Sequence, residues 1–220
     1  LRTPLTLIKG YAETVRDLTA SDPERRTQQV NVIVEETDRL SALVNSVMEL
    51  SRMSSGTEKP QKVTFDMAQL CEEVAQRYED VCARNGYTLE VKADTPCMVN
   101  ADAAMMERVL HNLLGNALHH IGEDGWLGLS ALPTEGGGCR VEVSDHGCGI
   151  APEDLPHLFD KYYRSRKDAG KVGTGLGLSI TKAILQSHGF RFGVQSQVGE
   201  GSTFWFETSA PAQSLPAAQS

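Results

Sequence analysis

The stretch GTGLGLSI at residues 173–180 has glycine at three alternate positions and then runs directly into helix-forming residues. Glycine has no Cβ, so the backbone of this stretch can approach a ligand closely. The unpaired N–H groups at the start of a helix point towards an anion that binds there. The pattern therefore predicts either a cradle for a phosphate group or an ordinary loop and helix cap, and the surrounding sequence has to distinguish the two.

The composition is that of a folded globular protein with room for one large domain or two small ones. The 220 residues are 40% hydrophobic and 23% charged, with a formal net charge of −8. This negative charge argues against nucleic acid or an anionic membrane surface as a partner. The five cysteines show no CxxC spacing, which predicts free thiols in a reducing compartment. No apolar run reaches the roughly 18 residues that suggest a membrane span, so we expect this region to be cytoplasmic, without direct membrane contact.

The first 56 residues predict two antiparallel helices. Apolar residues recur at helical spacing up to about residue 18, and from Val30 to Val47 they alternate in steps of three and four, as in a coiled-coil seam. Between these runs, Asp22 is a suitable N-cap and Pro23 a suitable first residue of the second helix. One hairpin cannot cover its own seam, so we expect a homodimeric four-helix bundle. The alternative is that the hairpin packs on the downstream domain.

From residue 60 onward, strand patterns of period two alternate with helical patterns. Helices are predicted over residues 67–85, from Asp102 through HNLLGNAL, and over GLGLSITKAILQSHG, which ends at Gly189. Strands are predicted at KVTFDM, TLEVKA, WLGLSALP, CRVEVSD, FRFGVQSQ and STFWFET. This order predicts an α+β fold in which helices cover one face of a mixed sheet.

Two polar features fall within these elements. Asn112 and Asn116 are four residues apart and share a helix face, where their amide oxygens would suit Mg²⁺; a capping or solvated pair is the alternative. Asp145 ends a strand just before Gly147 and Gly149. A buried carboxylate needs a partner, which the exocyclic amine of adenine could supply, although a simple Asx turn has the same sequence pattern.

The segment at residues 151–172 shows no clear regular structure. It carries a basic cluster of Arg164, Arg166, Lys167 and Lys171 just before the glycine stretch. A loop of this length is often a functional lid, and its basic residues could meet a phosphate tail. The alternative is a solvated charged surface.

Five motifs occur in a fixed order: HNLLGNAL, DHGCGI, FDKYYR, GTGLGLSI and GEGSTFWF. Together they resemble the N box, first glycine box, F box, second glycine box and closing strand of sensor histidine kinases. The opening LRTPLT resembles the H box of the same family just after its phospho-accepting histidine. The resemblance covers nearly the whole chain except its C-terminal tail, and it favours the phosphate cradle for the glycine stretch.

The resemblance implies a dimerising, histidine-phosphotransfer hairpin at residues 1–56, incomplete at its N-terminus, and a Bergerat-type ATP-binding α/β sandwich at residues 57–209. Residues 210–220 are rich in Ala, Pro, Ser and Gln and are expected to be disordered. The implied activity is transfer of the γ-phosphate of Mg-ATP to a histidine and then to an aspartate of a response regulator receiver domain. The full-length protein is expected in the cell membrane with this region on the cytoplasmic side.

The resemblance also assigns residue roles. Asn112 and the lid residue Arg164 are implied to act in catalysis, Asn116 to bind Mg²⁺, and Thr3 to assist dephosphorylation of the regulator beside the helix-bending Pro4. The implied nucleotide-binding residues are Asn112, Asn116, His119, Asp145, Gly147, Gly149, Phe159, Arg164, Gly173, Thr174, Gly175, Leu176 and Gly177.

The chain departs from the family pattern in two places. His119 and His120 stand where the family usually has a lysine and an aromatic residue, which leads to the hypothesis that ATP binding is weaker or pH-sensitive. The acceptor histidine and the glutamate beside it would lie just before Leu1, and all six histidines of the chain lie in the ATP-binding half. We therefore expect this chain to bind Mg-ATP but not to phosphorylate itself at the usual site.

Two other functions stay open. One is an ATP-binding and dimerisation module without autokinase activity that retains phosphatase support. The other is an ATP-hydrolysing conformational machine with the same nucleotide fold. Related ATPases carry a glutamate where Asn112 stands, and an amide cannot act as the base that activates water, which argues against the second.

Overall fold

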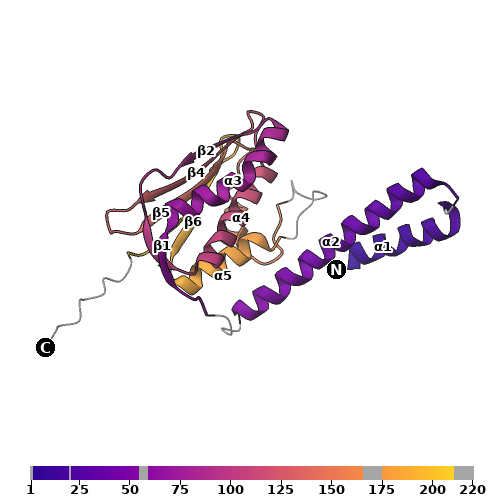
Figure 1. Ribbon diagram of the computed structural model, residues 1–220, viewed down its shortest axis with the longest axis horizontal. Coiled ribbons are helices and arrows are strands. Elements are labelled where there is room, and N and C mark those ends of the chain that lie inside the picture. The colour runs from indigo at the N-terminus through magenta and orange to yellow at the C-terminus, as the bar shows by residue number, and fades with distance from the viewer. Residues whose placement is uncertain (1, 20, 55–58, 166–174, 211–220) are drawn as a thin grey trace. The chain divides into compact units, whose positions relative to one another are not determined.

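The computed structural model describes residues 2–19, 21–54, 59–165 and 175–210 of the chain (Figure 1). They divide into two compact units, Leu1–Arg52 and Met53–Ser220. Residues 166–174 and 211–220, which include the predicted Gly173 and Thr174 contacts, three of the basic lid residues and nearly all of the predicted disordered tail, lie outside the described residues.

The first unit is a helical hairpin, as the sequence predicts. Helix α1 spans Arg2–Thr14 and continues as a five-residue π-helix at Val15–Thr19, while α2 spans Pro23–Ser54. The Asp22 side chain accepts a hydrogen bond from the Arg25 backbone N–H at 3.1 Å, which confirms the predicted cap. Large apolar side chains that stay exposed in this unit are Leu5, Leu7, Leu18, Val30, Val34, Val44 and Met48.

The second unit is built on a five-stranded mixed sheet in the order β2-β4-β5-β7-β6. Strand β2 is parallel to β4, and the other neighbours are antiparallel. The strands span Thr88–Lys92 (β2), Trp126–Pro133 (β4), Cys139–Asp145 (β5), Arg191–Gln197 (β6) and Gly201–Glu207 (β7).

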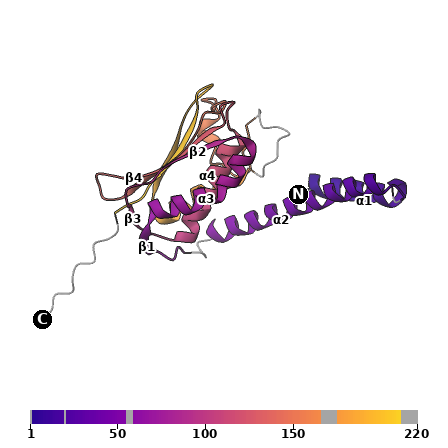
Figure 2. The ribbon, with the colours of Figure 1, turned by 45° about the horizontal axis from the view of Figure 1, so that its top comes forward.

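Three helices cover one face of this sheet, which confirms the predicted α+β architecture (Figures 1 and 2). Helix α3 (Met67–Asn85) contacts β2 and β4, α4 (Ala103–His119) contacts β5, and α5 (Gly177–His188) contacts β6. The core between the two layers includes Leu110, Leu114, Ile184 and Phe206, all of which are fully buried. The packed layers hold α4 and the start of α5 against each other and against the end of β5.

The second unit also contains a separate two-stranded sheet that the sequence pattern does not predict. Strand β1 (Val63–Asp66), which the pattern does predict, pairs antiparallel with β3 (Met98–Ala101), which it does not. Asp66 ends β1 and caps α3: its Oδ1 accepts from the N–H groups of Ala68 and Cys97. The chain therefore turns from strand into helix at this residue.

Within the described ranges, no helix combines the length and apolar character that crossing a bilayer requires. All five cysteines are free thiols, as predicted, and only Cys148 is exposed.

Candidate functional site

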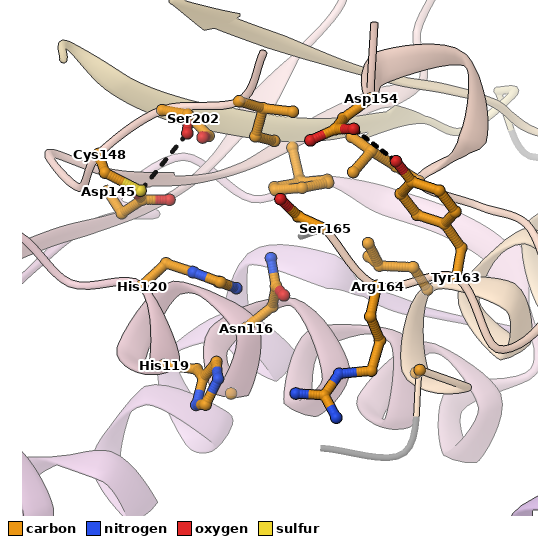
Figure 3. Close-up of a pocket in the computed structure, with 18 of the residues that line it drawn as sticks. Asn116, His119, His120, Asp145, Cys148, Asp154, Tyr163, Arg164, Ser165 and Ser202 are labelled. Carbon is orange, nitrogen blue, oxygen red and sulfur yellow. Dashed lines mark hydrogen bonds between the residues drawn. The ribbon is translucent and has the colours of Figure 1, made fainter. Parts of the chain in front are cut away.

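A cavity of about 340 Å³ opens in the second unit between α4, the end of β5 with the segment after it, and the start of α5 (Figure 3). Eight of the residues singled out in the sequence line it: Asn112, Asn116, His119, Asp145, Gly149, Arg164, Gly175 and Gly177. These residues come from four motifs that are far apart in the chain, so the fold brings the motifs together around one space.

Asp145 is the buried acid of the cavity. It ends β5 with 4% of its surface exposed, and its Oδ1 accepts a hydrogen bond from the Gly147 N–H at 2.8 Å. Burial raises the pKa of this carboxyl above its ordinary value, because the charged form loses hydration. Gly147 approaches the backbone so closely that a Cβ there would lie 2.0 Å from the His120 carbonyl oxygen. A ligand N–H group that donates to Asp145 would offset the cost of its buried charge.

The two asparagines lie on the cavity side of α4. The Asn112 side-chain NH₂ donates to the Gly177 carbonyl at 3.2 Å and to the Thr181 hydroxyl at 3.4 Å. These bonds tie α4 to the first turn of α5 and fix the plane of the Asn112 amide. Asn116 lies one helical turn further along, where its amide also faces the cavity (Figure 3).

The donor set of this cavity fits a hard cation that is shared with a ligand. Among the described residues, no group of three or more His, Cys, Asp or Glu side chains could hold a metal ion by itself. The amide oxygen of Asn116 is a hard donor, and Mg²⁺ is commonly held by one or two protein oxygens together with phosphate oxygens and water. Asn116 therefore suits Mg²⁺ that arrives with a nucleotide.

The described part of the glycine stretch lies beside Asn112 and forms a further part of the cavity wall. Gly175 has φ +67°, and a Cβ there would lie 3.0 Å from backbone atoms of Tyr162 and Tyr163. Gly177 begins α5, and Leu176 between them is fully buried. The start of a 12-residue helix thus faces the cavity, an arrangement that favours a bound anion.

Charged groups are unevenly distributed around the cavity. In Figure 3, the carboxylates of Asp145 and Asp154 are drawn on one side, while the guanidinium of Arg164 is on the other, together with the neutral amide of Asn116 and the imidazole of His119. An elongated ligand with an amino group at one end and an anionic group at the other matches this distribution.

Four other predicted residues do not line the cavity. Phe159 packs edge-on against Phe192 and Phe204, with ring centroids 5.2 and 6.4 Å apart, so it anchors the segment to the sheet. Leu176 belongs to the core, and Gly147 lies beneath Asp145. Thr3 is an exposed residue of α1 in the first unit.

Several lining residues are not singled out by the sequence analysis, although three of them lie within its quoted motifs. Ser202 lies on β7 directly opposite Asp145 in the strand register. Asp154 and Tyr163 are joined by a hydrogen bond of 2.6 Å between the tyrosine hydroxyl and the carboxylate. Cys148 and Ser165 complete the polar lining. Only Asp154 could have been marked by its charge, and nothing in the spacing connects it to Tyr163.

The chain matches two known families. Residues 101–212 match the family described as "Histidine kinase-, DNA gyrase B-, and HSP90-like ATPase", and residues 1–56 match the "His Kinase A (phospho-acceptor) domain". The chain is 30% identical to the sensor protein SrrB of Staphylococcus aureus over 213 residues, which are 96% of this chain and 36% of SrrB. It thus spans little more than a third of the length of this curated relative.

Solved structures share the fold. The crystal structure of full-length ShkA in complex with AMPPNP has a TM-score of 0.74 and 28% identity, covering 89% of this chain and 41% of ShkA. The histidine kinase ThkA, solved with the response regulator protein TrrA, has a TM-score of 0.77 and 24% identity, covering 97% of this chain and 60% of ThkA.

Proposed function

Because the chain belongs to the histidine kinase-, DNA gyrase B- and HSP90-like ATPases and carries the phospho-acceptor hairpin of sensor histidine kinases, we propose that it is the catalytic core of such a kinase. Its second unit binds Mg-ATP, and the γ-phosphate passes to a histidine that precedes Leu1 in the natural protein and then to an aspartate of a response regulator. The observation that carries this proposal is the convergence of Asp145, Asn116, Arg164 and Gly177 on one cavity.

The nucleotide is oriented by its two ends. The adenine amino group donates to the buried Asp145, and Gly147 and Gly149 shape the backbone around the base. The phosphates extend towards Asn116, His119 and Arg164 and towards the turn that starts α5. The domain boundaries proposed from the sequence, residues 1–56 and 57–209, assign this whole site to the second domain.

The reaction is a displacement at phosphorus. A neutral imidazole nitrogen of the acceptor histidine attacks the γ-phosphorus, the P–N bond forms, the bond to the bridging oxygen breaks, and ADP leaves. Asn116 would hold Mg²⁺ together with the phosphates, and the ion would supply charge neutralisation there. Arg164 adds positive charge at the same end, and Asn112 fixes α4 against α5. Asn112 is an amide and cannot act as a general base, which favours transfer to a protein nucleophile over hydrolysis.

The hairpin supplies the partners. We propose that its exposed apolar side chains, among them Val30 and Val44, are covered in a homodimeric four-helix bundle. A receiver domain of a response regulator docks on the hairpin, where Thr3 assists dephosphorylation. We propose that this region lies in the cytoplasm as part of a membrane-anchored protein.

A second candidate is an ATP-binding module without autokinase activity that retains phosphatase support. The specific observation in its favour is His119, which stands on the cavity where the family usually has a lysine. Labelling of the protein by γ-labelled ATP distinguishes the two candidates, because only the kinase acquires protein-bound phosphate.

Calorimetric titration of the chain with ATP in the presence of Mg²⁺ tests the binding step. We expect saturable binding that Asp145→Asn weakens by about tenfold or more, because the amide replaces a charged acceptor of the base. Asp94→Asn makes the same chemical change at an exposed position away from the cavity and serves as the control. Absence of ATP binding, or equal affinity in Asp145→Asn and the original chain, would contradict the proposed site.

A further inference from the structure

The hydrogen bond between Tyr163 and Asp154 joins two parts of the segment that connects β5 to α5. The Tyr163 hydroxyl donates to Asp154 Oδ1 at 2.6 Å, and both residues line the cavity (Figure 3). The Tyr163 ring also packs against His157, with centroids 5.6 Å apart. Tyr163 is therefore held through both its hydroxyl and its ring by residues 154–157.

This stretch is itself anchored to the core. Phe159 packs edge-on against Phe192 on β6 and Phe204 on β7. A single 3₁₀ turn at Leu155–His157 precedes it. Asp154 is thus a fixed point relative to the sheet.

Arg164 follows Tyr163 directly in the chain. On the other side of Tyr163, the Tyr162 N–H donates to the Gly175 carbonyl at 3.0 Å. Gly175 leaves little room there, since a Cβ would meet the backbone of both tyrosines at 3.0 to 3.1 Å. The contacts of Tyr163 with Asp154 on one side and with the glycine turn on the other therefore set the position of the Arg164 backbone.

We propose that Tyr163 is a positioning residue: its hydrogen bond to Asp154 holds Arg164 on the cavity so that the guanidinium meets the phosphate end of the nucleotide. This inference rests on the proposed function. Ordering an arginine is costly, because its side chain has one of the largest conformational entropies. When the backbone of Arg164 is already held in place, only its side chain has to be ordered as the nucleotide binds. A charge fixed before the reaction stabilises the transferring phosphate more than a mobile one.

The test separates the phosphate end of the nucleotide from its base. Binding of Mg-ATP and of ADP is measured by calorimetry, and phosphoryl transfer by the rate of labelling in the natural chain that includes the residues before Leu1. Tyr163→Phe removes only the hydroxyl and keeps the ring contact with His157. Tyr162→Phe is the matched control, because the Tyr162 side chain is 59% exposed and does not line the cavity.

We expect Tyr163→Phe to weaken ATP binding by about threefold to tenfold, the range for loss of one hydrogen bond, and to slow transfer, while the Kd for ADP stays within about twofold. Asp154→Asn keeps an acceptor oxygen and should retain most of the activity. Asp154→Ala should reproduce the Tyr163→Phe defect and add little to it in the double variant.

A purely structural role predicts a different result, in which Tyr163→Phe lowers ATP and ADP affinity equally. That result, or unchanged ATP binding and transfer, would overturn the positioning role while leaving the proposed function intact. If the original chain binds neither nucleotide, the proposed function fails, and the positioning role fails with it.

Discussion

His119 is the residue at which the cavity departs most clearly from the family pattern. It is exposed at the last position of α4, lines the cavity, and packs edge-on against His120. A lysine at this position would carry a permanent positive charge, whereas the charge of an imidazole depends on pH. The effect of this exchange should therefore depend on pH.

We expect His119→Lys to tighten Mg-ATP binding more at pH 8 than at pH 6, by about threefold to tenfold at the higher pH for one added charge near the phosphates. The original chain should bind more weakly as the pH rises. Titration calorimetry at both pH values checks this, with Gln186→Lys at an exposed position outside the cavity as the control. A flat affinity from pH 6 to 8 in the original chain would contradict the pH-sensitive hypothesis.

Among the individual site residues, the sequence predicts those that lie in motifs of recognisable order. It misses those that come together only when the chain folds. The predictions of Asp145, Asn116 and Gly177 came from local patterns, and all three line the cavity. Ser202 reaches the cavity only because β7 pairs with β5, a long-range pairing that no local pattern encodes. Phe159 was expected at the nucleotide, but its ring lies in an aromatic cluster with Phe192 and Phe204.

Among the secondary-structure elements, α4 and α5 are joined by a buried histidine at the start of α4 and the end of α5, remote from the cavity. The His188 Nδ1–H donates to the Ile184 carbonyl at 2.8 Å, and its Nε2 accepts from the N–H of Asp102, the N-cap of α4, at 3.1 Å. The bond from Asp102 requires the neutral ring, because a protonated Nε2 cannot accept a hydrogen bond. Burial lowers the pKa of His188, because the charged ring would lose its hydration.

The stability of the second unit should therefore fall in acid. The unfolded chain binds a proton at His188 near the ordinary imidazole pKa of about 6.5, while the folded unit binds it only at lower pH. Stability from this group is fully present above about pH 6.5 and is lost as the pH falls through the lowered folded pKa. Urea unfolding at pH 7.5 and 5.5 should show this loss in the original chain.

His188→Ala should cost about 1–3 kcal/mol at pH 7.5, because it leaves the Asp102 N–H without its acceptor, and it should flatten the pH dependence. His157→Ala changes an exposed histidine and should have a much smaller effect. An equal pH slope in His188→Ala and the original chain would show that His188 does not link the helices in this way.

The glycine turn before α5 should be intolerant of any side chain. Gly175→Ala places a Cβ in the left-handed region, which costs about 1–2 kcal/mol, and close to the backbone of Tyr162 and Tyr163. We expect lower stability and weaker ATP binding. Gly136→Ala is the control, since a Cβ there meets nothing within 4 Å. Thermal unfolding and ATP titration measure both effects, and a Gly175→Ala variant that matches the original chain in both would contradict the close packing.

Most elements of the second unit could be predicted because each has a strong period or a clear terminal signal. Helix α3 occupies the predicted residues, and α5 ends at Gly189 with φ +74°. Strand β3 was not predicted, because it has four residues, contains an asparagine, and owes its existence to pairing with the distant β1. The π-helical turn that follows α1 likewise has no signal in the apolar spacing.

For the whole molecule, the exposed apolar side chains of the hairpin favour the proposed homodimer. Val44 is 41% exposed on α2, and a charge at this position would be buried in the proposed dimer. We expect Val44→Asp to weaken dimerisation at least about a hundredfold, because burying an unpaired charge is costly. Asn45→Asp adds the same charge at the neighbouring exposed position, on a different face of the helix. Analytical sedimentation measures the dimerisation of both variants and of the original chain. A monomeric original chain or a dimeric Val44→Asp variant would contradict the proposed bundle.

Direct labelling tests whether this site passes the γ-phosphate of ATP to a histidine, as we propose. The natural chain, extended upstream of Leu1, is incubated with γ-labelled ATP and Mg²⁺, with Asp145→Asn in parallel. We expect a label on the protein that is lost in acid and stable in base, as a phosphohistidine is, and that is strongly reduced in Asp145→Asn. ATP binding without any protein-bound label would contradict the kinase assignment and favour the ATP-binding module.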